Sequence, residues 1–139
     1  MADEVKAVTA ANEAFYRAFE TLETKEMEQV WLRASHIKCI HPGWPLLCGW
    51  GPIMTSWERI FDNTLGMRFT LRDVRVEVSG SFGWVVLIED LESRGYDGAS
   101  RAQIVTTNLF EKRDGRWFIV HNHASPILAP PTPGEEQLQ

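Results

Sequence analysis

A two-residue turn signal, Asp114-Gly115, separates two long runs of β-prone residues and constrains this chain more than any other feature. Asp-Gly between alternating apolar residues is the strongest short-range signal for a hairpin with a type I′ turn. Such a turn fixes the register of its two strands, so Phe110 is predicted to face Ile119 and Lys112 to face Trp117.

The same register predicts that Asn108 faces His121 and that Thr106 faces His123. Side chains alternate between the faces of a sheet, so these four polar residues are expected on the face that carries Phe110. Opposed Cβ atoms lie about 5 Å apart. Two imidazoles beside neutral hydrogen-bonding groups predict a ligand pocket on this face.

Composition limits the class of protein. A chain of 139 residues with 44% hydrophobic residues and six Trp is long and apolar enough to form a globular core. Its net charge of −5 and the absence of a basic stripe argue against nucleic acid or an anionic membrane as partner. The first residues lack the features of a secretory signal, and no apolar run reaches the roughly 18 residues of a membrane span. Cys39 and Cys48 are too few for a disulfide framework, so a reduced, cytoplasmic setting is expected.

Helices are predicted in the first half of the chain. Apolar residues recur at three- and four-residue steps over about the first twenty residues. Thr24 is a candidate N-cap for a second helix. Pro52 suits the first position of a third helix, and Gly66 is placed to end it.

Strands are predicted after Met67, where the apolar period changes to two. A parity switch predicts a β-bulge near Arg72-Asp73, and the run 82–91 is apolar on both parities. Helices followed by strands indicate an α+β fold, with three helices on one face of a curved antiparallel sheet. The other face has no cover within the chain, so at least a dimer is expected. Its apolar residues are Val105, Leu109, Phe118 and Val120.

One domain is predicted over residues 1–128. Residues 129–139 are rich in proline and are expected to form an extended or loose tail.

The hairpin sequence TTNLFEKRDGRWFIVHNHASP resembles the family of cone-shaped nuclear transport factor 2-like, or SnoaL-like, domains. It is most similar to the association domain of calcium/calmodulin-dependent protein kinase II and its free-standing bacterial relatives. Supporting segments are the helix around Phe15, His41-Pro42-Gly43 and the residues from Gly49 to Trp57. The resemblance implies a deep pocket between sheet and helices, and a homodimer or larger ring assembled through the outer face of the sheet.

The resemblance does not extend to kinase activity or calcium regulation, because the chain has no kinase domain and no calmodulin-binding segment. Free-standing relatives often carry a third histidine between the two of the hairpin, where this chain has Asn122. The expected partners are therefore a small molecule and further copies of the chain, with no cofactor and no metal. A His-x-His pair alone is weak evidence for a metal site, and His41, Cys39 or Glu89 as third ligand has no diagnostic spacing.

Several candidate site residues have two interpretations. His121 and His123 are acid–base candidates or hydrogen-bonded residues of the sheet. His41 faces the pocket mouth or caps a strand end. Trp57 either forms a pocket wall or belongs to the core.

Glu89 ends a very apolar strand and joins the same pocket if Ser93 to Ser100 closes as a hairpin. A one-residue slip would select Asp90 instead. In an apolar pocket the carboxylate would have a raised pKa and could act as a base. The favoured alternative is an ion pair with Arg101. Thr106 and Asn108 are neutral donors that could hold a carbonyl oxygen.

Two classes of function remain. The favoured hypothesis is a non-catalytic module that binds a small ligand and self-associates, with a ligand pocket of His41, Trp57, Glu89, Thr106, Asn108, His121 and His123. Protonated histidine would favour a small polar or anionic ligand there. The alternative is a cofactor-independent isomerase, cyclase or hydrolase resembling ketosteroid isomerase and the polyketide cyclases.

Overall fold

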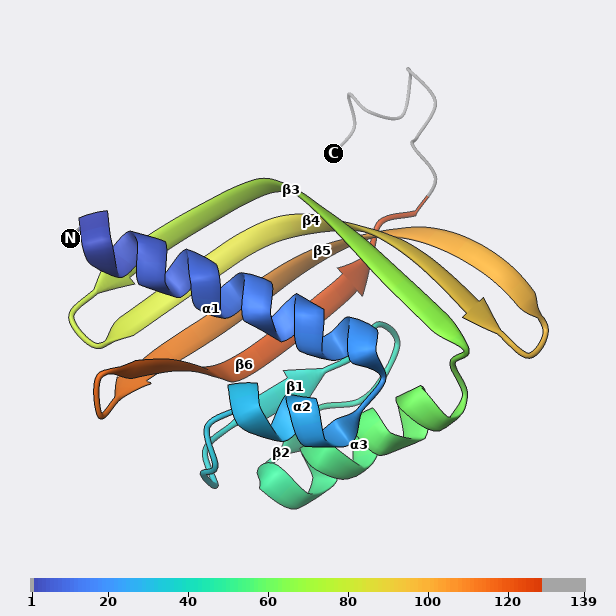
Figure 1. Ribbon diagram of the computed structural model, residues 1–139, viewed down its shortest axis with the longest axis horizontal. Helices are drawn as coiled ribbons and strands as arrows, with labels where there is room; N and C mark the ends of the chain where they lie inside the picture. The colour runs from blue at the N-terminus through green and yellow to red at the C-terminus, as the bar shows by residue number, and fades with distance from the viewer. Residues whose placement is uncertain (1, 129–139) are drawn as a thin grey trace.

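The computed structural model describes residues 2–128, in which three helices lie against one face of a strongly curved sheet (Figure 1). The proposed tail at 129–139 lies outside the described residues. The helices are α1 (Ala2–Thr21), α2 (Thr24–Val30) and α3 (Trp50–Asp62). The strands are β1 (Lys38–Ile40), β2 (Leu47–Cys48), β3 (Gly66–Ser79), β4 (Phe82–Gly95), β5 (Gly98–Arg113) and β6 (Arg116–Pro126). The α+β class and the three-helix arrangement are confirmed.

The helix boundaries differ in detail from the predicted ones. The N-cap of α2 is Glu23 rather than Thr24, and the cap forms no side-chain hydrogen bond. The helix α3 begins at Trp50, two residues before Pro52, because Gly49 adopts a φ of 88° as its N-cap. It ends at Asp62, so Gly66 begins β3 instead of ending the helix.

The sheet has the strand order β2-β1-β6-β5-β4-β3. The long strands β3 to β6 pair antiparallel, as predicted. The short strand β1 pairs parallel with β6, so the sheet is mixed and the prediction of a fully antiparallel sheet is corrected. This pairing places Cys39 next to Asn122 and thereby brings the loop before α3 against the end of the hairpin.

The predicted turn at Asp114-Gly115 and the predicted bulge are confirmed. Asp114 and Gly115 have φ of 52° and 77°, as a type I′ turn requires. The register of β3 shifts between Arg72 and Arg75, and Asp73 in that bulge has a φ of 53°. Ser93 pairs with Ser100, so the β4–β5 connection closes as a hairpin.

A second bulge, in β6, overturns the predicted register of the hairpin beyond its first few pairs. Phe110 faces Ile119 as expected, but Leu109 faces His121, so Val120 is an extra residue on β6. Asn108 therefore faces Asn122 rather than His121, and Thr106 faces Ala124 rather than His123. A one-residue shift moves every later side chain to the opposite face, so His121 and His123 change sides.

The reason for this bulge lies outside the hairpin. The amide of Leu32 donates to the carbonyl of Ile119 at 3.1 Å, and Trp31 forms a parallel bridge with the same residue. Hence β6 bonds to the segment after α2 as well as to β5. Val120 is buried, with 7% exposure. The prediction that it belongs to the uncovered apolar face is therefore wrong.

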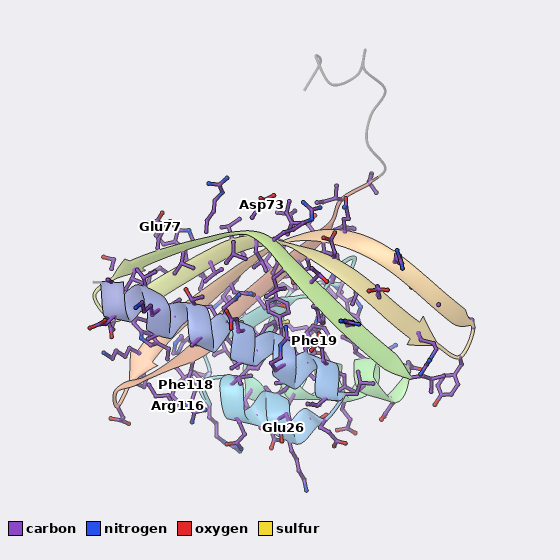
Figure 2. The ribbon with its side chains drawn as sticks, turned by 45° about the horizontal axis from the view of Figure 1, so that its top comes forward. Phe19, Glu26, Asp73, Glu77, Arg116 and Phe118 are labelled. Atoms are coloured by element: carbon purple, nitrogen blue, oxygen red, sulfur yellow. The ribbon has the colours of Figure 1, made fainter. Side chains whose placement is uncertain are left out.

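The sheet thus has two chemically different faces. The inner face packs on the helices, where Phe19 lies between helix and sheet (Figure 2). The outer face points away from the helices, as Asp73 and Glu77 do in the same view. Among residues 2–128, every helix is too short or too polar to span a membrane.

Candidate functional site

A pocket of about 250 Å³ opens between the inner face of the sheet and the helices, and we call it the inner pocket. Its polar wall consists of His41, Glu89 and Asn122. Its apolar wall includes Phe19, Trp44, Ile60, Phe69, Leu91 and Ile104. A larger hollow of about 540 Å³ lies at the far ends of β3, β4 and β5, but exposed charged side chains such as Arg68 and Arg101 line it. Mostly apolar walls with a few convergent polar groups make the inner pocket the stronger candidate.

Glu89 supplies the carboxyl group of the inner pocket. Its side chain is buried, and the Tyr16 hydroxyl donates to its Oε2 at 2.5 Å. Burial raises the pKa of Glu89, while the hydrogen bond from Tyr16 and the proximity of the Thr106 hydroxyl oppose the rise. The predicted ion pair with Arg101 is wrong, because Arg101 pairs with Glu92 at 3.3 Å on the outer face.

Asparagine side chains extend from Glu89 into the core. Asn108 Nδ2 donates to Tyr16 Oη at 3.1 Å and to Asn12 Oδ1 at 3.0 Å. Asn122 Nδ2 donates to Asn108 Oδ1 at 2.7 Å. Burial, and then the charge of Glu89, raise the pKa of Tyr16. The result is a buried, hydrogen-bonded chain that joins α1, β4, β5 and β6.

His41 is the third polar residue that lines the pocket. Its Nε2 lies 2.8 Å from Ser56 Oγ, and its ring stands edge-on to Trp57 with centroids 4.6 Å apart. Burial lowers the pKa of His41 to about 4, so the ring is neutral at pH 7. Cys39 lies behind it, with Sγ 3.6 Å from Asn122 Oδ1, and burial raises the pKa of this thiol.

The structure brings together part of the predicted site. His41 and Glu89 line the inner pocket, and the buried Thr106 and Asn108 lie behind Glu89. The Thr106 hydroxyl has no well-formed hydrogen bond. Trp57 is fully buried and supports His41 from the core.

His121 and His123 are not part of this group. The bulge at Val120 places them on the outer face, with ring centroids 6.3 Å apart, and His123 is exposed. Burial, followed by the charges of His123 and Lys38, lowers the pKa of His121. Their predicted position beside Asn108 is therefore wrong.

Three residues of this hydrogen-bonded chain were not predicted as site residues from the sequence, namely Asn12, Tyr16 and Asn122. Asn12 and Tyr16 sit four residues apart on α1, on the face that also buries Val8 and Phe15. A polar group within an apolar helical stripe was the available signal for Asn12, since buried polar groups need partners. Asn122 could be placed only by knowing the bulge.

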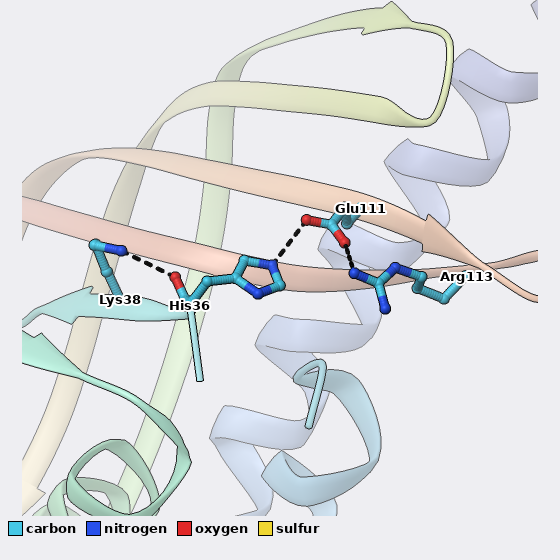
Figure 3. Close-up of polar contacts among 4 residues, drawn as sticks. All are labelled: His36, Lys38, Glu111 and Arg113. Carbon is cyan, nitrogen blue, oxygen red and sulfur yellow. Dashed lines mark hydrogen bonds and ion pairs between the residues drawn. The ribbon is translucent and has the colours of Figure 1, made fainter. Parts of the chain in front are cut away.

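On the outer face of the sheet, polar side chains form partly exposed ion pairs instead of buried hydrogen bonds. Glu111, which lies between Phe82 and Phe118 in the register, accepts from His36 at 2.9 Å and from Arg113 at 2.7 Å (Figure 3). Desolvation alone would raise the pKa of Glu111, but hydrogen bonds from His36 and Arg113 hold it below its ordinary value. Asp90 likewise pairs with Arg72 at 2.6 Å. Across residues 2–128, no three His, Cys, Asp or Glu side chains gather as a metal site would require.

This cone-shaped sheet, with helices closing a partly polar pocket, defines the class of nuclear transport factor 2-like domains. A family model described as SnoaL-like domain matches residues 8–130, and the chain belongs to this family.

Solved structures agree with this assignment. A proposed dehydratase of the NTF2-like family from Streptomyces avermitilis is 34% identical, with a TM-score of 0.86, and the match covers 91% of this chain and 98% of that one. A proposed calcium/calmodulin-dependent protein kinase type II association domain from Thiobacillus denitrificans is 31% identical, with a TM-score of 0.77 and coverage of 86% and 94%. The resemblance predicted from the hairpin is therefore confirmed.

A curated relative is the F-box protein SKIP8 of Arabidopsis thaliana, which is 28% identical over 123 residues. The match covers 88% of this chain and 51% of the relative, so the chain spans about half the length of that protein.

Proposed function

We propose that this chain binds a small molecule in the inner pocket and self-associates through the outer face of its sheet. The observation that carries the first part is a buried carboxylate, Glu89, on the wall of a mostly apolar pocket without a cationic partner among the described residues. Burying a carboxylate costs free energy that a well-packed core would avoid. A buried carboxylate without a compensating cation is typical of binding and catalytic sites.

The ligand class differs from the one first expected. A preference for anions depended on protonated His121 and His123, and both lie on the outer face. The imidazole that does reach the pocket, His41, is neutral at pH 7. A carboxylate ligand would meet Glu89 with no compensating charge, so the proposed ligand is small, largely apolar and not anionic.

Fragment binding to the isotope-labelled chain tests this part. Small aromatic alcohols are expected to shift the amide signals of His41, Leu91 and Ala124, because these residues line the pocket. The variant Ala124→Phe fills the pocket and should abolish those shifts, whereas Ala10→Phe, at an exposed position of α1 outside the pocket lining, should leave them intact. Shifts scattered over the surface, or unchanged in Ala124→Phe, would refute the proposal.

A second candidate is proton transfer by Glu89. Burial raises the pKa of Glu89, as it does for many general acids and bases, and the 34% identical relative is a proposed dehydratase. The test is deuterium exchange at the α-carbon of small ketones in D₂O. Exchange that falls to the uncatalysed rate in Glu89→Gln, but not in Glu92→Gln, would support catalysis; equal exchange in all three proteins would exclude it.

Self-association is supported by the outer apolar patch, which we define as Phe82, Trp84, Val105, Leu109 and Phe118. Phe82, Trp84 and Val105 are 37%, 41% and 39% exposed, which leaves large apolar side chains in water. Such patches commonly mark interfaces. The 31% identical relative is named as an association domain.

Analytical ultracentrifugation at micromolar concentration tests this part. We expect at least a dimer, and we expect Trp84→Glu to convert it to a monomer, because a charge would be buried within the apolar interface. The exposed Thr70→Glu on β3 is the matched control and should keep the oligomer. A monomeric parent protein would contradict the proposal.

A further inference from the structure

The direction of each hydrogen bond around the inner pocket defines what a ligand must supply. Ser56 has one hydroxyl proton, and it is donated to the carbonyl of Ile53 at 2.6 Å. Ser56 Oγ must therefore accept from His41 Nε2, which lies 2.8 Å away. A neutral imidazole has one N–H, so His41 keeps no donor for a ligand.

The chain that ends at Glu89 is directed in the same way. Both Nδ2 protons of Asn108 are used, one by Asn12 and one by the Tyr16 oxygen. Tyr16 therefore spends its single proton on Glu89 Oε2 at 2.5 Å. Neither Tyr16 nor Asn108 has a donor left, and the second oxygen of Glu89 remains an acceptor.

Asn122 is the one exception on the polar wall. One of its Nδ2 protons goes to Asn108 Oδ1, and its own Oδ1 lies 3.6 Å from the Cys39 thiol. The other Nδ2 proton has no acceptor among residues 2–128. The polar wall thus offers a carboxylate oxygen and the Nδ1 of His41 as acceptors, and a single amide proton as donor.

The remaining wall suits a positive charge. No Lys or Arg belongs to the described lining of the pocket, and Phe19, Trp44 and Phe69 supply aromatic rings. Cations are attracted to aromatic faces, and an ammonium group has three donors and no acceptor. A cation would also compensate the buried carboxylate.

We propose that the inner pocket selects a small organic cation, a protonated amine on an apolar aromatic or aliphatic body, whose ammonium group pairs with Glu89. This inference rests on the proposed ligand-binding function and specifies its ligand class. The carboxylate binds the ammonium, the aromatic wall surrounds the body, and Asn122 provides a donor for one acceptor on the ligand.

Three matched probes test it by calorimetric and NMR titration of the full chain at pH 7, namely benzylamine, benzyl alcohol and benzoate. They share a ring and differ in charge. We expect benzylammonium to bind at least about tenfold more tightly than benzyl alcohol, with benzoate weakest. Glu89→Gln should bring benzylammonium down to the affinity of the alcohol, which itself changes less than about threefold. Glu92→Gln, three positions along the same strand on the outer face, is the control and should behave as the parent.

Each outcome decides a different point. Equal or tighter binding of benzyl alcohol or benzoate in the inner pocket would overturn the cation inference and leave the proposed function standing. Absence of pocket shifts for all three probes at millimolar concentration would contradict the proposed function itself. If Glu89→Gln does not fold, the order of the affinities of the three probes for the parent protein still tests the cation inference.

Discussion

Glu89 and Asp90 are neighbours on β4, yet their pKa values move in opposite directions. Burial raises the pKa of Glu89 on the inner face, whereas the hydrogen bond from Arg72 lowers that of Asp90 on the outer face. Alternating side chains of one strand thus enter two different environments. On the inner face polar groups form a buried, directed network, and on the outer face they form solvated ion pairs around an apolar patch.

The comparison explains why similar residues carry different weight. A buried donor or acceptor that loses its partner costs about 1–3 kcal/mol, whereas an exposed ion pair contributes about 0–1 kcal/mol. The proposed ligand binding on the inner face therefore depends on specific hydrogen-bond partners. The proposed self-association through the outer face depends on its exposed apolar area.

Deleting Val120 is expected to have the largest effect. Without the extra residue, Ile119 directly precedes His121, so the pairs of β6 with β5 continue as a regular ladder and the side chains keep their faces. The segment between Ile119, which bridges Trp31, and His121, which pairs with Lys38, is then one residue shorter, so β6 cannot keep both of these contacts. We expect a loss of about 5 kcal/mol or more, or no folding, measured by urea denaturation. Val120→Ala keeps the bulge and should cost clearly less. Equal stability of the two variants would show that the bulge is not needed for β6 to bond to both Trp31 and β1.

Core truncation on adjacent residues of β5 is the second test. Phe110→Ala, on the inner face with 1% exposure, should cost about 3–5 kcal/mol. Leu109→Ala, on the partly exposed outer face, should cost about 1 kcal/mol or less when the chain is dilute enough to be monomeric. Similar losses for both would mean that the outer face is covered within the monomer.

Much of the fold could be predicted from the sequence because its signals are local. The Asp114-Gly115 turn, the bulge near Arg72 and the helical periodicity of α1 each depend on neighbouring residues. The parallel β1–β6 pairing was not predictable in this way, because three residues of β1 carry no pairing signal of their own.

The candidate site was only partly predictable for the same reason. Glu89 was found because the β4–β5 hairpin register is local. Asn122 and the two histidines were misplaced because Leu32, far away in the sequence, bonds to Ile119 and stabilises the bulge. A long-range hydrogen bond thus decided which side chains reach the pocket.

The pH dependence of stability should distinguish the buried His41 from exposed groups. Its folded-state pKa of about 4 lies below the ordinary value of 6.5, so its contribution to stability is complete above pH 6.5 and falls as the pH drops to about 4. The full loss is roughly 3 kcal/mol. His41→Gln, which keeps a donor for Ser56, should lack this loss in urea titrations between pH 7 and 4. If the free energy of unfolding changed equally with pH in the variant and the parent, a buried neutral imidazole at His41 would be contradicted.

Glu89 should act with the opposite sign in the same experiment. Its folded-state pKa is raised, so its destabilising effect grows as the pH rises from the unfolded value through the folded one. Glu89→Gln should therefore gain stability relative to the parent as the pH increases from 4 to 7, while Glu92→Gln should not. A difference that stays constant with pH would refute the raised pKa.

The smallest effect is expected from His123→Ala, compared with Asn122→Ala next to it. Asn122→Ala leaves Asn108 Oδ1 buried without its donor, so it should cost about 1–3 kcal/mol and weaken ligand binding in the inner pocket. His123 is exposed on the outer face, so its removal should change stability by no more than about 0.5 kcal/mol and leave the affinity for benzyl alcohol unchanged. Any effect of His123→Ala should appear in the self-association constant instead. If His123→Ala weakened pocket binding as much as Asn122→Ala does, the two faces would be coupled, and their separation by the bulge would no longer account for the site.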